Sequence, residues 1–396
     1  MSHLVRDARA YVLLLAATLT VLSNAMISPA LPSIEADFAD VPNADLLARL
    51  LLTAPSLVVA LLAPLAGGAA DRFGRIRQML LGTLLFALAG TAGLWLEDLT
   101  SILASRLLLG VAVAMVMTAQ SALIGDFYSG PVRARFMGYQ MSAVNFSGFL
   151  FITLAGFLAT LSWRAPFAIY GLAFLFVPLF WALLPKREIV PEKDAAPQAG
   201  EGLPGWQLMV GAISVLSGLT FVLFYVLPTQ VPYYLAELGD PSPVSAGRVM
   251  ASMMLCAGIS AMVYGPARDA LGRAGTPAAG MTVMALGFWL LHDAQSLRYL
   301  MLAAAVVGTG LGLVIPCFIN IALGAAPPHR RGMASGVVTT SIFLGQFLSP
   351  VVSLPVIARF GYADAFAAAS LLLLAMAASM LVLLRERPRA LAREGG

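Results

Sequence analysis

Two nine-residue segments, residues 67–75 and 265–273, carry the same pattern of small and charged residues. The matching residues are Gly67 and Gly265, Asp71 and Asp269, Gly74 and Gly272, and Arg75 and Arg273. An aspartate four residues before an arginine can form an ion pair, and glycine permits a tight turn and a close approach of helices. Contacts of this kind can form in one conformation and break in another, so the pattern indicates a conformational switch.

The two segments are displaced by 198 residues, which is half of the 396-residue chain. The same displacement carries Gly110 onto Gly308 and Arg133 onto Arg331. One shift that relates three separate regions is difficult to explain by chance. We therefore predict that the chain consists of two homologous halves.

The elements that position these residues are apolar helices. Hydrophobic residues make up 60% of the chain and charged residues 11%, whereas a soluble domain carries about 25% charged residues. Twelve apolar runs are long enough to cross a bilayer, near residues 10–31, 46–69, 78–96, 101–124, 138–160, 165–184, 206–230, 246–267, 276–294, 298–323, 332–357 and 363–384. We predict an all-α integral membrane protein of twelve transmembrane helices in two pseudo-symmetric six-helix bundles.

The predicted division is an N-terminal bundle of residues 1–184, a polar linker of residues 185–205 and a C-terminal bundle of residues 206–396. If the N-terminus is cytoplasmic, 18 of the 24 basic residues fall on the cytoplasmic side. This bias predicts that both termini and the linker are cytoplasmic. We expect the membrane to be a bacterial-type inner (plasma) membrane.

The segment after the second span also matches the pattern G-x-x-x-D-R-x-G-R, with Arg72 following Asp71. In this position, and repeated between spans eight and nine, it resembles the signature of the major facilitator superfamily of secondary transporters. The resemblance implies that Asp71 docks near the start of the eleventh helix, around Gly332–Ser335, and Asp269 near the start of the fifth, around Phe136–Gly138. A helix N-terminus favours a carboxylate there. The alternative is that these charges only fix the topology, Arg72 in particular.

Arg106 lies about one turn inside the fourth span, in the pattern R-x-x-x-G with Gly110. The pattern resembles the fourth-helix motif of the same superfamily and implies substrate contact or a part in proton coupling. A charged residue inside a span should face a cavity or a partner. The alternative is that Arg106 lies near the outer end of its helix and extends to the membrane interface.

Polar side chains inside other spans are candidates for lining a central cavity, although many such groups only bond to a neighbouring helix. By the resemblance, spans one, five, seven and eleven line that cavity, which selects Asn24, Asn145, Tyr225 and Gln346 as substrate-binding candidates. Asp126, which ends the fourth span ahead of Arg133 and Arg135, is expected to form a structural ion pair.

Proton coupling is expected to involve acidic groups, yet no carboxylate lies in the middle of a predicted span. Glu35 and Asp37, at the outer end of the first helix, are with Arg106 the nearest candidates. The alternative for both carboxylates is that they are solvated loop residues.

The predicted function is secondary transport by alternating access, as a proton-coupled exporter of small amphipathic or drug-like compounds. Residues 29–34, P-A-L-P-S-I, resemble the first-helix end of bacterial exporters, whereas residues 151–156 lack the fifth-helix G-P-x-x-G-G pattern of many drug antiporters. Uptake or facilitated transport of a sugar or organic acid is the alternative, and a transporter-like sensor is a second.

An enzyme is not indicated, because the three histidines have no metal-ligand spacing and no nucleotide-binding loop is found. The expected partners are a small-molecule substrate, the lipid bilayer and protons. We expect no cofactor, no metal and no nucleic acid, and a monomer.

Overall fold

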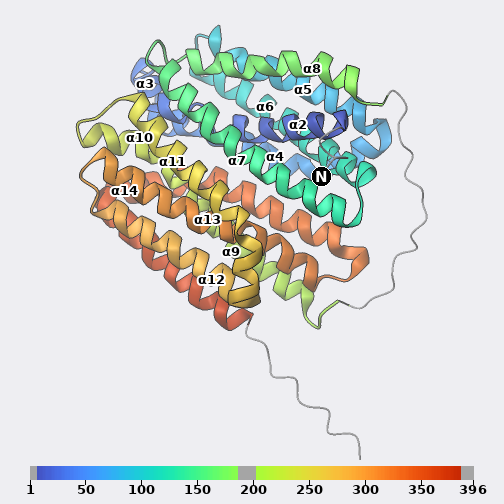
Figure 1. The fold of residues 1–396 in the computed structure, drawn as a ribbon. Helices are drawn as coiled ribbons and strands as arrows, with labels where there is room; N and C mark the ends of the chain where they lie inside the picture. The colour runs from blue at the N-terminus through green and yellow to red at the C-terminus, as the bar shows by residue number, and fades with distance from the viewer. Residues whose placement is uncertain (1–6, 186–201, 385–396) are drawn as a thin grey trace, which may run out of the picture.

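The computed structural model describes residues 7–185 and 202–384, and all the regular structure within these ranges is helical (Figure 1). The helices of the first half are α2 (Ala8–Ala25), η1 (Ser28–Ala30), α3 (Leu31–Asp37), α4 (Ala44–Phe73), α5 (Arg75–Thr91), η2 (Ala92–Leu94), α6 (Leu99–Phe127), α7 (Gly130–Ala159), η3 (Ala165–Gly171) and α8 (Leu172–Leu183). Those of the second half are α9 (Trp206–Phe224), α10 (Val226–Glu237), α11 (Pro243–Met262), α12 (Tyr264–His292), α13 (Leu297–Ala325), η4 (Pro328–Arg330) and α14 (Arg331–Leu383).

Eleven helical segments of the described residues are long and apolar enough to cross a membrane. The last of them contains α14, whose 53 residues would extend about 80 Å at about 1.5 Å per residue, more than twice the hydrocarbon thickness of a bilayer. Gly361, with φ 81° and ψ 171°, interrupts the helix and divides it into residues 331–360 and 362–383. The described residues therefore contain twelve segments long enough to cross a bilayer, as predicted.

Successive crossings run antiparallel, so the connections gather at two ends of the molecule. We call the end that holds Asp7, Leu384 and the α4–α5, α6–α7 and α13–α14 connections the terminal end. The distal end holds the α3–α4, α7–η3 and α10–α11 connections and Gly361. In Figure 1 the first half, blue to green, lies above the second half, yellow to red.

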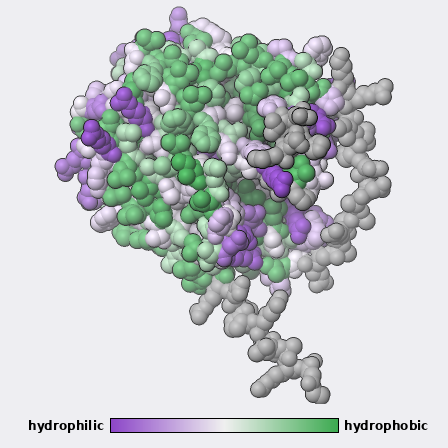
Figure 2. All heavy atoms as spheres, viewed as in Figure 1, coloured by the Kyte–Doolittle hydropathy of each residue, from purple (hydrophilic) through white to green (hydrophobic). Residues whose placement is uncertain are grey.

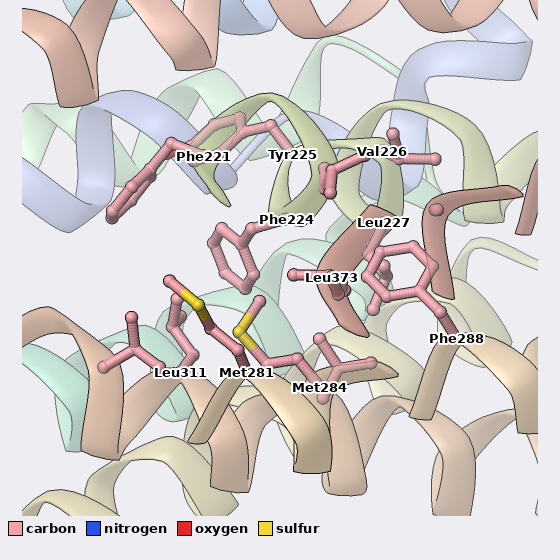
Figure 3. Close-up of a cluster of buried hydrophobic side chains, with 14 of the residues drawn as sticks. Phe221, Phe224, Tyr225, Val226, Leu227, Met281, Met284, Phe288, Leu311 and Leu373 are labelled. Carbon is pink, nitrogen blue, oxygen red and sulfur yellow. The ribbon is translucent and has the colours of Figure 1, made fainter. Parts of the chain in front are cut away.

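The buried hydrophobic residues form two clusters, one for each half. The first extends from Ala10 to Leu184 and includes one residue of the second half, Phe343. The second extends from Val210 to Leu384 and includes one residue of the first half, Ile152. Figure 3 shows part of the second cluster, with aromatic rings of α9 opposite the Met side chains of α12. Because each half has its own core, each can move as a unit.

The outer surface is apolar where the helices cross. Large hydrophobic side chains are exposed on many helices, including α4, α8, α12 and α14. In Figure 2 hydrophobic side chains cover most of the visible face between its two ends, and hydrophilic residues gather toward those ends. A surface of this composition requires lipid, not water, as its solvent.

The repeated glycines Gly110 and Gly308 each let two helices approach. A Cβ atom added at Gly110 would lie 2.6 Å from the backbone oxygen of Pro55, and one at Gly308 would overlap the backbone oxygen of Met253. Neither neighbour is a flexible side chain, so the helices themselves would have to move apart.

We therefore expect Gly308→Ala to destabilise the folded protein by about 1–3 kcal/mol, the usual range for overpacking. The matched control is Gly211→Ala in α9, where an added Cβ atom meets nothing within 4 Å. Thermal unfolding in detergent would compare the two variants. Equal melting temperatures would show that the α11–α13 contact tolerates a methyl group.

Candidate functional site

The first copy of the repeated segment forms a charged cluster at the terminal end. Gly74, between α4 and α5, adopts φ 102°, a conformation that glycine reaches without strain. This turn brings Arg75 back to Asp71, whose Oδ1 accepts from Nη2 at 2.7 Å and from Nε at 3.1 Å. Nη1 of Arg75 also donates to Asp126 of α6. One arginine therefore ties together the ends of three helices.

A second set of contacts strengthens the same end of the first half. Asp7 caps α2, accepting from the backbone N–H of Arg9 at 3.0 Å, and its Oδ2 accepts from the hydroxyl of Tyr128 at 3.0 Å. Partial burial raises the pKa of Asp7, but the hydrogen bonds from Arg9 and Tyr128 outweigh it, so the pKa lies below its ordinary value. These contacts join the start of α2 to the α6–α7 connection.

The second copy has the same backbone but different electrostatics. Gly272 also adopts a positive φ, of 73°, as expected for the position equivalent to Gly74. Neither Asp269 nor Arg273 has an ion pair among the described residues. The residue displaced by 198 from Asp126 is Gly324, so the second half lacks the equivalent carboxylate. Nη2 of Arg273 is buried without a hydrogen-bond partner.

The predicted docking of Asp71 near Gly332–Ser335 is not among the contacts that the structure gives. The Asp71 side chain is 64% exposed. A Cβ atom added at Gly67, Gly138, Gly265 or Gly332 would meet nothing within 4 Å. The described residues therefore leave open space beside these four glycines at the terminal end in this conformation. The docking of Asp71 and that of Asp269 near Phe136–Gly138 remain predictions for another conformation.

At the distal end, by contrast, polar side chains connect the two halves. Ser28 of η1 donates to the backbone oxygen of Pro228 in α10 at 2.5 Å. Nearer the middle of the crossings, Ser56 of α4 donates to Oε1 of Gln346 in α14 at 2.7 Å. The molecule is thus closed at its distal end.

Arg49 of α4 is the charged residue of this closure, and sequence reasoning did not single it out. Its side chain is 6% exposed, and its Nη1 donates to Oε2 of Glu35 at 3.0 Å. Its Nε donates to Oε1 of Gln230 in α10 at 3.1 Å, and its guanidinium lies 3.7 Å from the ring centroid of Tyr233. The only sequence signal is an arginine about one turn into an apolar run.

The proton-coupling candidates at this end differ in their surroundings. Glu35 is half-buried in the ion pair with Arg49, so it is not a freely solvated loop residue. Asp37 is exposed, and its Oδ2 accepts from the indole N–H of Trp163 at 3.0 Å. Of the two carboxylates, Glu35 alone is paired with the arginine that bonds across the halves.

Arg106 is fully buried inside the first half. Its Nη2 donates to the backbone oxygens of Ala89 and Gly90 at 3.0 and 2.8 Å, where the C-terminal carbonyls of α5 attract a cation. The guanidinium carbon lies 4.8 and 5.0 Å from the ring centroids of Phe167 and Tyr170. Arg106 therefore does not extend to the membrane interface. Among the described residues, its Nε and Nη1 have no hydrogen-bond partner.

Three of the four substrate-binding candidates lie between the halves or at a break in a crossing. Asn145 of α7 packs against Gly258 of α11, where an added Cβ atom would lie 2.9 Å from the Asn145 Cβ. Gln346 meets Ser56 across the halves. Tyr225 lies at the α9–α10 junction beside Phe221 and Phe224 (Figure 3). The side chain of Asn24 in α2 lies outside what the structure describes.

Comparison with known proteins identifies the family. The sequence profile of the Major Facilitator Superfamily matches residues 13–247 and again residues 212–396. The chain is 26% identical over 354 residues to the bacillibactin exporter of Bacillus subtilis, with 84% of this chain and 85% of that protein covered. It is 23% identical over 343 residues to the quinolone resistance protein NorA of Staphylococcus aureus, again with 84% and 85% covered.

Solved structures agree in fold. The inward open xylose transporter XylE from E. coli superposes with a TM-score of 0.74 at 17% identity, over 95% of this chain and 96% of that one. The human organic anion transporter MFSD10 superposes with a TM-score of 0.71 at 19% identity, over 94% and 98%.

Proposed function

This chain belongs to the Major Facilitator Superfamily, and we propose that it exports small amphipathic compounds by alternating access, driven by proton entry. Its membership makes it a multi-pass membrane transporter of small molecules rather than an enzyme. The relatives from Bacillus subtilis and Staphylococcus aureus are named as an exporter and as a resistance protein. These names favour export over uptake of a sugar or organic acid.

The observation that carries the mechanism is the difference between the two ends. The halves are bonded across the distal end through Ser28 and Arg49, while glycines at the terminal end have open space. Two separately packed halves, joined at one end and apart at the other, are suited to rocking about a central site. We assign the terminal end to the cytoplasm of a bacterial-type inner membrane, so this conformation faces inward.

In the proposed cycle the repeated segments act at the cytoplasmic gate. Asp71, held by Arg75, and Asp269, beside Arg273, would dock against the opposite half when the transporter faces outward. Substrate would contact Asn145, Tyr225 and Gln346, with Asn24 and Arg106 as further candidates. Glu35 is the preferred site for the coupled proton, because its charge stabilises Arg49 in the closed distal end. We propose that a monomer completes the cycle.

The test is transport by the purified protein in proteoliposomes with an imposed pH gradient, with internal pH followed by an entrapped dye. Lipophilic cations, neutral drugs, organic acids and sugars would be screened in turn. We expect a lipophilic compound to trigger proton movement against a baseline of empty liposomes. Uptake of a sugar or organic acid that ignores the pH gradient would replace the exporter with a facilitator.

A further inference from the structure

Arg49 makes contacts in both halves at once. In its own half it donates to Oε2 of Glu35 at 3.0 Å and to the backbone oxygen of Asp45 at 2.7 Å. In the other half it donates to Oε1 of Gln230 and lies over the ring of Tyr233. Gln230 in turn donates to Ser353 of α14 at 2.9 Å. Arg49, Glu35, Gln230, Tyr233 and Ser353 form what we call the Arg49 network.

The two kinds of contact have different roles. A guanidinium that is 6% exposed needs a negative partner, because an unpaired buried charge costs several kcal/mol. Glu35 and the Asp45 carbonyl supply this compensation from the same half, so they remain when the halves separate. The bonds to Gln230 and Tyr233 cross between the halves and exist only while the distal end is closed. Glu35 therefore positions Arg49, and Arg49 makes the closure.

The internal repeat shows that this closure is asymmetric. A displacement of 198 residues carries Arg49 onto Gly247 of α11. Gly247 packs directly on Gly156 of α7, where an added Cβ atom would lie 3.2 Å from the Gly156 Cα. One side of the distal end is thus held by a charged network and the equivalent position on the other side by contact of two backbones. Of the two equivalent positions, Arg49 alone offers bonds across the halves that depend on its side chain.

We propose that Arg49 is the gating residue of the distal end, which stabilises the inward-facing state through Gln230 and Tyr233 while Glu35 positions it. This inference rests on the proposed alternating-access function. The proposed distal gate is an arginine bound to an amide and an aromatic ring. The proposed terminal gate consists of the repeated aspartate–arginine segments. Loss of Arg49 shifts the population toward the outward-facing state, because the bonds that are lost exist only in the inward-facing state.

Thr53 provides a reporter for this shift. It lies on α4 one turn from Arg49, on the face that also carries Ser56, and it is fully buried beneath the closure. The reporter is Thr53→Cys in a background with Cys256→Ser and Cys317→Ser, labelled by a membrane-impermeant maleimide from the distal side. Met333→Cys, at the exposed start of α14, reports on the terminal end in the same background.

We expect Arg49→Gln to raise the rate of labelling at Thr53→Cys by about tenfold or more, the effect of losing one charge-assisted hydrogen bond, and to lower labelling at Met333→Cys. The matched control is Arg248→Gln, which removes an exposed arginine of α11 near the same end and should change neither rate. Glu35→Gln should act in the same direction as Arg49→Gln but less strongly.

Gly247→Leu keeps the proposal testable if Arg49→Gln fails to fold. A leucine against Gly156 wedges the distal end open while leaving Arg49 intact, so it should also raise labelling at Thr53→Cys. Adding Arg49→Gln to that variant should then have little further effect, because the bonds that it removes are already broken. Unchanged labelling in a folded Arg49→Gln protein overturns the gate, whereas failure to transport any compound, with labelling as expected, overturns only the proposed export.

Discussion

Asp71→Asn is expected to lower the initial rate of transport by about tenfold, equivalent to about 1.4 kcal/mol, without preventing membrane insertion. Asp71 now bonds to Arg75 through two nitrogen atoms, and asparagine keeps the size of the side chain but removes its charge. In the proposed outward-facing state this charge docks near a helix N-terminus, where a partly buried carboxylate contributes up to about 2 kcal/mol. The measurement is counterflow in proteoliposomes, normalised to reconstituted protein.

Two matched variants separate gating from simple loss of charge. Arg72→Gln changes the adjacent predicted gating residue, whose side chain is exposed; under the alternative that Arg72 only fixes topology, this variant leaves the rate close to wild type. Asp269→Asn should lower the rate less than Asp71→Asn, because Asp269 lacks an ion pair here and Gly324 replaces the second carboxylate. A transport rate for Asp71→Asn equal to that of Arg72→Gln would contradict the gating role.

The features that the sequence predicted are those fixed by local chemistry. Apolar run length gave twelve crossings, and the two motif glycines, Gly74 and Gly272, adopt the positive φ that their turns require. The ion pair expected for Asp126 is present, but its partner is Arg75, 51 residues away. Arg133 and Arg135, close by in sequence, have no ion pair among the described residues. Pairing across helices depends on packing angles that no local pattern records.

The sequence did not indicate Arg49 for the same reason, because its partner is even farther away along the chain. Its bond to Gln230 spans 181 residues and joins opposite halves, so neither residue carries a local sign of the other. The conformational state was equally unpredictable, because the same sequence must support both the open and the closed form of each end. The repeated segments indicated the proposed gate at the terminal end from the sequence alone. No repeat marks the proposed gate at the distal end, because the position equivalent to Arg49 is Gly247.

Arg106→Met is expected to lower transport by about tenfold or more while leaving the melting temperature unchanged or higher. The arginine is 0% exposed, and its Nε and Nη1 have no hydrogen-bond partner among the described residues. A buried charge carries a desolvation cost of several kcal/mol, and methionine removes that cost while keeping a side chain of similar length. A charge retained in such a place therefore indicates a function other than stability, which is the part in substrate contact or proton coupling proposed here.

The competing explanation is that Arg106 holds α5 against α6 through the carbonyls of Ala89 and Gly90. It makes the opposite prediction, since Arg106→Met would then lower the melting temperature, and transport per folded molecule would recover. Arg106→Lys distinguishes the two further: lysine keeps the charge but cannot reproduce the planar guanidinium stacked beside Phe167 and Tyr170. If charge alone matters, the lysine variant transports; if the guanidinium geometry matters, both variants lose transport while both remain folded.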